Sequence, residues 1–440
     1  MLCLIKFKLF FIFAGHFKTY GMSTTKYFPS VENIEKASEV LSEILEPTPF
    51  QKNADLSATY KADVFLKRED LQMVRSYKIR GAYNKIRSID PETLKYGIVC
   101  ASAGNHAQGV AFSCNKLQIM GSIYMPTTTP KQKIEQVRMF GKDYIDIVLT
   151  GDTFDAANAA AMEFARKSGK TFIPPFDDPK IMEGQGTIGH EILEQTKEKL
   201  DYIFIPIGGG GLASGLGAYI RQMSPETKII GVEPAGAPCM KAAIDNGSVV
   251  ELEQINKFVD GAAVKKAGAM TYEVCKEILD DIVIVPEGAV CTTIIHMYNK
   301  SAIVVEPAGA LAIAALSQYE DKIKGKKVAC IVSGSNNDIT RMEEIREKSL
   351  LHEGLKHYFI ITFPQKPGVM LAFIRDIIGP TDDMVYFQYI KKTNKEFGPA
   401  LVGIELADKA DFHAILRSMD AHNIIYEHIN ENNKLFEILI

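Results

Sequence analysis

One lysine of the chain stands between an aromatic residue and the expected start of a helix. Lys78 lies in the stretch VRSYKIRGA, residues 74–82, and not in a run of charges. Most lysines are solvated surface residues, and the stretch by itself favours that interpretation. An amine buried against an apolar wall, however, loses its charge near neutral pH and can then form a Schiff base with an aldehyde. The other motifs of the chain decide between these two possibilities.

Four consecutive glycines form a second motif. They follow the apolar segment IFIPI and precede a helix that we expect to begin at about Leu212; the four are Gly208, Gly209, Gly210 and Gly211. Glycines allow backbone N–H groups to approach a ligand without interference from β-carbons. The start of the following helix adds a partial positive charge. The motif therefore predicts a phosphate-binding loop.

The same glycines leave the kind of phosphate ligand open. Gly208, Gly210 and Ala213 match a relaxed dinucleotide fingerprint, G-x-G-x-x-A, and Glu233 lies about where an acid that binds a ribose would be expected. A nicotinamide- or flavin-dependent oxidoreductase would have the same local pattern. The glycine motif alone does not separate these enzymes.

Two further polar loops follow predicted strands. The segment SAGNH provides a hydroxyl, backbone N–H groups and a helix start, which favour binding of an anion such as a carboxylate. Its residues are Ser102, Ala103, Gly104, Asn105 and His106. The segment VSGSNND, residues 332–338, places the Ser333 hydroxyl directly after an apolar strand. Each loop alone could be a helix cap, but three such loops at strand ends lie where open α/β sheets bind ligands.

These loops belong to an alternation of strands and helices that begins after Pro47. Short apolar segments predict strands at 63–67, 97–101, 122–125, 145–149, 202–206, 228–233, 281–285 and 328–332, and the helical patterns between them include 153–167, 183–197 and 308–318. Strands separated by helix-length segments indicate parallel βαβ units. Several strands are apolar throughout, as expected where helices cover both faces of a sheet.

The C-terminal part has a different organisation. After a charged helix-and-linker passage, the predicted order is strand 357–363, helix 367–378, strands 384–392 and 400–406, helix 409–422 and strand 424–429. The order βαββαβ is that of a ferredoxin-like domain. This part lacks a cluster of catalytic side chains, so we interpret it as a binding or assembly domain.

Together these motifs resemble the pyridoxal-phosphate enzymes of the tryptophan-synthase-β fold type, and most closely the threonine ammonia-lyase (threonine dehydratase) family. The resemblance covers about residues 34–341 and is carried by SYKIRGA, SAGNHAQG, GGGGL and SGSNND, with GVEP and EPAGA in support. The C-terminal part is similar to the ACT-like regulatory domain of the biosynthetic members. The resemblance implies a two-lobed α/β fold with open parallel sheets, fold type II, followed by a ferredoxin-like regulatory domain.

The resemblance also implies domain boundaries. The catalytic domain would occupy residues 22–345, with a smaller lobe at about 76–165 inserted in the larger one, and the regulatory domain residues 351–440. Residues 1–21 are basic and apolar, which is typical of a signal peptide, but their apolar run is far shorter than a membrane span. We expect this segment to be a non-native extension, with Met22 as the alternative start.

The resemblance assigns roles to the residues of the motifs. Lys78 would hold pyridoxal 5'-phosphate as a Schiff base and act as the catalytic base, and Ser333 would contact the ring nitrogen. Asn105 would bind the phenolic oxygen of the ring, and the loop from Gly208 to Leu212 would bind the phosphate. The loop from Ser102 to His106 would bind the substrate carboxylate.

The implied reaction is the deamination of L-threonine to 2-oxobutanoate and ammonia, the first committed step of isoleucine biosynthesis. A hydroxyl at the ring nitrogen would favour elimination over transamination, because it does not favour a protonated ring as a carboxylate would. L-Serine lacks one methyl group, which is worth only about 1–3 kcal/mol, and is expected as a secondary substrate. Tyr77 and Ser335 depart from the residues common in the family, and both bear on substrate preference.

The regulatory domain implies feedback inhibition by isoleucine, and the family implies a homotetramer. A catabolic serine/threonine dehydratase and a serine racemase remain as alternatives within the resemblance, although the C-terminal domain favours the biosynthetic type. A dinucleotide-dependent oxidoreductase and a non-catalytic amino-acid sensor remain as alternatives outside it. The retention of Lys78, Asn105 and Ser333 argues against the sensor.

Composition limits the remaining classes of function. The 440 residues are 46% hydrophobic and 24% charged, as in soluble globular proteins, and the formal net charge of −4 provides no basic surface for nucleic acid. The 7 cysteines include no Cys-x-x-Cys pair, which favours a reducing, cytoplasmic location. No segment is long enough to cross a membrane.

One helical segment suggests a metal site, because it contains His190, Glu191 and Glu194. The segment lacks the second histidine of H-E-x-x-H, so we expect a solvated helix face and no metal site.

Overall fold

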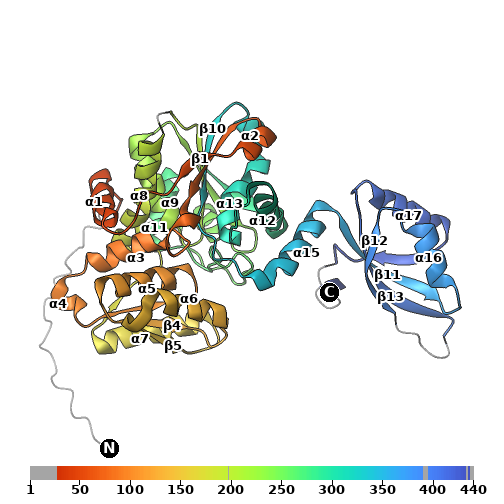
Figure 1. The fold of residues 1–440 in the computed structure, drawn as a ribbon, viewed down its shortest axis with the longest axis horizontal. Coiled ribbons are helices and arrows are strands. Elements are labelled where there is room, and N and C mark those ends of the chain that lie inside the picture. Colours follow the sequence, from red (N-terminus) through yellow and green to blue (C-terminus); the bar gives the residue numbers. More distant parts are fainter. Residues whose placement is uncertain (1–26, 197, 390–394, 433–434, 437–440) are drawn as a thin grey trace, which may run out of the picture.

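The computed structural model describes residues 27–196, 198–389, 395–432 and 435–436. Figure 1 shows a large lobe and a small lobe in contact, with a C-terminal domain that is joined to them through one helix, α15. The predicted extension of residues 1–21 and the alternative start at Met22 lie outside the described residues. Among the described residues, the helices are too short or too polar to span a membrane.

The large lobe is built on a six-stranded sheet with the order β1-β2-β10-β7-β8-β9. Its strands are β1 (Phe50–Lys52), β2 (Asp63–Arg68), β7 (Tyr202–Pro206), β8 (Lys228–Pro234), β9 (Asp281–Val285) and β10 (Lys327–Val332). The edge strand β1 pairs antiparallel with β2, and all other neighbours are parallel. The predicted parallel sheet is confirmed. The sequence pattern does not predict β1, because three residues are too few to establish an alternation.

Helices cover both faces of this sheet. The helices of the large lobe are α1 (Val31–Ser42), α2 (Ala54–Tyr60), α8 (Pro179–Gln195), α9 (Gly211–Met223), α10 (Cys239–Asn246), α11 (Ala269–Ile278), α12 (Glu287–Ser301), α13 (Pro307–Ala314) and α14 (Glu320–Ile323). On β7, Phe204 packs into the core beneath α12 and α13, whereas Ile203 and Ile205 pack into the core beneath α8, α9 and α11. A strand that is buried on both faces is apolar at every position, as β7 is.

Two of the predicted helices have different boundaries in the structure. The helix expected from 183 begins earlier, at Pro179, because the Asp178 side chain accepts hydrogen bonds from the backbone N–H groups of Lys180 and Ile181 at 2.8 and 3.2 Å. An aspartate at this position caps the helix and a proline fits its first turn. The helix expected at 308–318 is α-helical only to Ala314 and then continues as a 3-10 helix.

The small lobe contains a second, four-stranded parallel sheet with the order β5-β4-β3-β6. Its strands are β3 (Ile98–Ala101), β4 (Gly121–Met125), β5 (Ile145–Leu149) and β6 (Thr171–Phe172), and its helices are α3 (Lys78–Arg87), α4 (Pro91–Leu94), α5 (Asn105–Leu117), α6 (Lys131–Gly141) and α7 (Phe154–Ser168). The predicted strands are confirmed, and β6 is an additional, very short strand. The start of α5 directly follows the carboxyl end of β3, the edge where parallel sheets bind ligands.

The C-terminal domain has the predicted order βαββαβ. Its elements are β11 (Lys356–Pro364), α16 (Val369–Ile377), β12 (Asp383–Tyr389), β13 (Phe397–Glu405), α17 (Asp411–Ala421) and β14 (Ile425–His428). They form an antiparallel sheet with the order β12-β13-β11-β14, covered by the two helices. The end of the predicted strand 384–392 lies outside the described residues.

The passage between the two parts is a packed helix, α15 (Met342–Glu353), and not a loose linker. It lies against α12, where the hydroxyl oxygens of Thr292 and Ser349 are 3.0 Å apart. A β-carbon added at Gly288 would lie 2.4 Å from the His352 β-carbon, so the two helices approach closely. The domain boundary expected at residues 345–351 therefore falls within a continuous helix.

Candidate active site

Lys78 is the first residue of α3, and its amine points into the protein. Its Nζ donates a hydrogen bond to the carbonyl oxygen of Pro175 at 3.1 Å and lies 5.3 Å from the centre of the Tyr77 ring. Burial lowers the pKa of Lys78 to about 8, although the nearby Glu306 carboxyl raises it. The interpretation as a solvated lysine is therefore wrong, and about a tenth of the amine is neutral at pH 7, far more than for a lysine of ordinary pKa.

The glycine loop lies between β7 and α9, and the carbonyl groups of its first three glycines accept hydrogen bonds from neighbouring protein groups. The Gly208 carbonyl accepts a hydrogen bond from the Cys239 thiol at 3.4 Å, and the Gly209 carbonyl accepts one from the Thr271 hydroxyl at 2.6 Å. The Gly210 carbonyl accepts from the Ser214 N–H at 2.8 Å, within the first turn of α9. Because N–H and C=O groups of a trans peptide point in opposite directions, the N–H groups of the loop face away from these partners.

Two positions of this loop show why it is built of glycine. Gly210 has a φ of +94°, a conformation that residues with a β-carbon rarely adopt. A β-carbon at Gly209 would lie 2.4 Å from the Phe176 ring. Phe176 follows Pro175, whose carbonyl accepts the Lys78 hydrogen bond. The segment 175–176 thus brings the lysine amine and the glycine loop to the same place.

The loop from Ser102 to His106 connects β3 with α5. The Ser102 hydroxyl accepts a hydrogen bond from the Gly104 N–H at 3.2 Å, and the Gln108 N–H is bonded to the Gly104 carbonyl at 3.2 Å. The N–H groups of the first turn have no intrahelical acceptor and can bind an anion. The His106 ring, however, lies 3.0 Å from the carbonyl oxygen of Ile173, and burial lowers its pKa to about 3. His106 can therefore contribute its backbone N–H but not its ring.

Ser333 lies at the end of β10, next to the residue that precedes the lysine. Its carbonyl accepts a hydrogen bond from the Tyr77 N–H at 3.2 Å, and the residue is 2% exposed. The Ser333 hydroxyl forms no hydrogen bond with the residues that the structure describes. Further along the same loop, the Asn336 side-chain amide donates to the Asn105 side-chain oxygen at 2.8 Å. The predicted residues Lys78, Asn105 and Ser333 are thus brought together.

One acidic residue of the site has no role in the sequence-based prediction. Glu306 precedes α13 and is 4% exposed, and its Oε1 accepts a hydrogen bond from the Asn105 Nδ2 at 2.6 Å. Burial raises the pKa of Glu306 to about 7, and the Asp260 carboxylate acts in the same direction. The segment EPAGA contains this residue. A single charge within the apolar stretch IVVEPAGALAIA is the signal that could have identified it.

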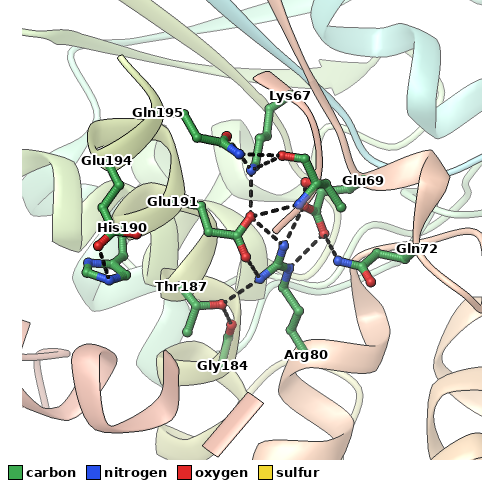
Figure 2. Close-up of polar contacts among 11 residues, drawn as sticks. Lys67, Glu69, Gln72, Arg80, Gly184, Thr187, His190, Glu191, Glu194 and Gln195 are labelled. Atoms are coloured by element: carbon green, nitrogen blue, oxygen red, sulfur yellow. Dashed lines mark hydrogen bonds and ion pairs between the residues drawn. The ribbon is translucent and has the colours of Figure 1, made fainter. Parts of the chain in front are cut away.

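A buried cluster of charges holds α3 in place. The Arg80 guanidinium lies between the carboxylates of Glu69 and Glu191, at 2.8 and 2.6 Å, and the Lys67 amine lies 2.5 Å from Glu191. Figure 2 shows the guanidinium between the two carboxylates. The prediction that Glu191 belongs to a solvated face is wrong, because its partners come from β2 and α3. Arg80 follows Lys78 on the same helix, so the cluster fixes the element that carries the amine.

Glu233 does not occupy the position that a dinucleotide would require. It is fully buried at the end of β8 and accepts hydrogen bonds from the backbone N–H groups of Met240 and Lys241 at 2.7 and 2.8 Å. Burial raises the pKa of this carboxyl to about 7. Glu233 therefore caps the start of α10, and its carboxylate oxygens are not available to a ribose.

These features fit pyridoxal 5'-phosphate. An aldehyde requires a neutral amine, which Lys78 provides, and a phosphate requires convergent N–H groups, which the glycine loop provides. The Asn105 amide can donate to a phenolic oxygen, and the Ser333 hydroxyl can accept from or donate to a ring nitrogen.

The six cysteines of the described residues are buried and form no disulfide; they are Cys100, Cys114, Cys239, Cys275, Cys291 and Cys330.

Comparison with known families gives the class of the protein. Residues 41–334 match the model of the pyridoxal-phosphate dependent enzymes, and residues 347–439 match the C-terminal regulatory domain of threonine dehydratase. The chain belongs to the family of pyridoxal-phosphate-dependent enzymes. Curated relatives include the biosynthetic L-threonine dehydratases of Halalkalibacterium halodurans, 56% identical over 93% of this chain and 99% of the relative, and of Bacillus subtilis, 52% identical over 93% and 97%. Within the family, the chain therefore groups with the biosynthetic threonine dehydratases.

Solved structures with a similar fold include a threonine deaminase and a serine racemase. Threonine deaminase isoform 2 from Solanum lycopersicum is 39% identical, with a TM-score of 0.69 over 73% of this chain and 95% of that chain. Maize serine racemase is 29% identical, with a TM-score of 0.68 over 74% and 99%. The predicted fold, two open parallel sheets followed by a regulatory domain, is confirmed.

Proposed function

We propose that the protein is a threonine ammonia-lyase, which converts L-threonine to 2-oxobutanoate and ammonia in isoleucine biosynthesis with pyridoxal 5'-phosphate as cofactor. Support comes from curated relatives of that name, 56% and 52% identical over 93% of this chain. The observation that carries the proposal is the inward-pointing Lys78 amine, bonded to Pro175 beside the glycine loop. An oxidoreductase is not favoured, because Glu233 caps a helix.

Four parts of the chain would hold the cofactor. Lys78 would bind its aldehyde carbon, and the N–H groups from Gly208 to Leu212 would bind its phosphate. Asn105 would donate to its phenolic oxygen, and Ser333 would contact its ring nitrogen. When bound, the cofactor withdraws electrons from the Cα atom of an amino acid, which makes the Cα proton acidic.

The side chains of the protein would then bind the substrate and transfer its protons. The N–H groups of the loop from Ser102 to His106 orient the substrate carboxylate, and the displaced Lys78 amine takes the Cα proton, for which a pKa of about 8 is suitable. The neutral Ser333 hydroxyl does not favour a positive charge on the ring nitrogen, so loss of the β-hydroxyl is favoured over transamination. One water is lost in the elimination and one is consumed in the hydrolysis that releases ammonia, which gives 2-oxobutanoate.

The remaining features follow from the same proposal. L-Serine is a secondary substrate, because it lacks only a methyl group. Isoleucine binds to the regulatory domain, residues 351–440, and inhibits the catalytic domain, residues 22–345. We further propose a homotetramer located in the cytoplasm.

The test is the turnover of L-threonine by the purified chain after its cofactor has been removed. Formation of 2-oxobutanoate should require added pyridoxal 5'-phosphate and should be abolished by Lys78→Ala. Lys85→Ala is the matched control, because Lys85 lies on the same helix but pairs with Asp178 at 2.6 Å, outside the site. Turnover by the Lys78→Ala protein at the wild-type rate would refute the proposal.

A further inference from the structure

Glu306 connects the two lobes at the candidate site. It precedes α13 of the large lobe, and its Oε1 accepts the hydrogen bond from Asn105, the first residue of α5 in the small lobe, at 2.6 Å. The carboxyl group also accepts a hydrogen bond from the Asn336 backbone N–H. A β-carbon at Gly334 would lie 2.6 Å from the same Oε1, so the carboxyl is enclosed on that side as well.

The partners of Asn105 fix the orientation of its side-chain amide. Its Oδ1 accepts a hydrogen bond from the Asn336 Nδ2 at 2.8 Å, while its own Nδ2 donates to Glu306. A side-chain amide has two N–H donors on one nitrogen. The Glu306 carboxyl accepts from one N–H of the Asn105 amide. The bond from Asn336 to the amide oxygen prevents the amide from rotating by half a turn, so the second N–H points in one defined direction.

We propose that Glu306 is a positioning residue for the cofactor, because it holds the Asn105 amide so that the second N–H meets the phenolic oxygen of the ring. This role depends on the contact between Asn105 and the cofactor that is part of the proposed function. Glu306 itself acts through Asn105 and needs no contact with the cofactor.

The surroundings of Glu306 support a specific role for a carboxyl group at this place. Desolvation of a buried carboxyl is unfavourable, and here it raises the pKa to about 7. The charged neighbours include Asp260, which opposes the ionisation of Glu306, and Lys133, which pairs with Asp260 at 2.6 Å and favours it. The Lys78 amine is also close enough for Glu306 to raise its pKa.

A double-mutant cycle on cofactor affinity tests the proposal. The dissociation constant for pyridoxal 5'-phosphate is measured on the cofactor-free protein, for wild type, Asn105→Ala, Glu306→Ala and the double variant. We expect Glu306→Ala to weaken the affinity about tenfold in the wild type, the effect of one hydrogen bond, and less than about twofold when Asn105 is already alanine. Glu306→Gln, which keeps an acceptor oxygen, should retain most of the affinity. Glu287→Ala is the control: Glu287 accepts a hydrogen bond from the Gly236 N–H at 2.7 Å, in the same lobe but outside the site.

The outcomes separate failure of this role from failure of the proposed function. Equal losses from Glu306→Ala in the two backgrounds would overturn the positioning role, since Glu306 would then act independently of Asn105. An unchanged affinity in Glu306→Ala would also overturn it. If Glu306→Ala does not fold, Glu306→Met, which keeps a side chain of similar length but has no acceptor oxygen, and its double variant with Asn105→Ala provide the same cycle. Equal losses in the two backgrounds, or an unchanged affinity in Glu306→Met, would again overturn the role. If the wild type does not bind the cofactor, or if Asn105→Ala binds it with unchanged affinity, the cofactor contacts of the proposed function are wrong. The positioning role of Glu306 is then wrong as well.

Discussion

Replacement of Arg80 by methionine should strongly destabilise the protein, although this residue does not contact the candidate site. Its guanidinium is 1% exposed and donates to both oxygens of Glu69, each at 2.8 Å, to both oxygens of Glu191 at 2.6 and 2.9 Å, and to the Thr187 hydroxyl at 3.1 Å. Methionine has a similar length but no charge. The buried set of Lys67, Glu69 and Glu191 would then carry one excess negative charge.

Removal of one partner from a buried ion pair costs about 3–5 kcal/mol, because the remaining charge is desolvated without compensation. We expect Arg80→Met to lose about this amount, a large part of the about 5–15 kcal/mol that keeps a typical domain folded. The double variant Arg80→Met/Glu191→Met leaves Lys67 and Glu69 as a neutral pair. It should recover at least about 1 kcal/mol relative to the single variant, despite the loss of more hydrogen bonds.

The assay is urea unfolding of the cofactor-free protein, followed by the far-ultraviolet circular dichroism of its helices. Arg221→Met serves as the control, because Arg221 pairs with Asp280 at 2.6 Å but is 28% exposed, and such pairs contribute about 1 kcal/mol or less. A loss below about 1 kcal/mol for Arg80→Met would refute the assignment of the cluster as the anchor of α3. A double variant less stable than the single variant would refute the electrostatic explanation.

Three further predictions concern regulation, pH and the reaction. Deletion of residues 355–440, which leaves α15 intact, should abolish inhibition by isoleucine while L-threonine turnover remains; persistent inhibition would contradict the regulatory assignment. The pKa of Glu306 is raised from 4.5 to about 7, so ionisation of this carboxyl is less favourable in the folded protein than in the unfolded chain. The contribution of Glu306 to the free energy of unfolding should therefore decline by about 3 kcal/mol as the pH rises from about 4.5 to 7. Melting curves of Glu306→Gln at pH 5 and 8 should lack this decline. Ser333→Asp should increase half-transamination relative to keto-acid formation, and an unchanged ratio of the two products would show that the group at the ring nitrogen does not control the outcome.

The sequence predicts the strands of both lobes well, because their apolar runs reflect burial on both faces of a parallel sheet. β7 at Tyr202–Pro206, β5 at Ile145–Leu149 and β9 at Asp281–Val285 have the predicted boundaries. Prediction is less accurate at helix starts, where one cap changes the boundary. Asp178 moves the start of α8 to Pro179, ahead of the first residue with clear apolar periodicity.

The residues that sequence reasoning misses are those whose partners are far apart in the chain. Glu191 lies beside His190 and Glu194 in a segment that looks like a solvated face, but its partner Arg80 is 111 residues away. Glu306 and Asn105 are separated by 201 residues. Local patterns contain no information on such pairs, whereas the phosphate-binding loop is recognisable because one short segment contains its strand, its glycines and its helix start. Lys78 is recognisable only together with the other motifs.

The position of α15 gives a physical route between the two parts of the protein. The loop that carries Ser333 and Asn336 continues through one short 3-10 turn, Ile339–Arg341, into this helix, so the helix and the candidate site share one segment of backbone. At the other end, the Tyr358 hydroxyl of β11 donates to Glu347 of α15 at 2.8 Å. Packed helices move as rigid bodies and do not bend continuously. A rearrangement of the regulatory sheet that displaces α15 would therefore displace Asn336 and, through it, the Asn105 amide that Glu306 holds.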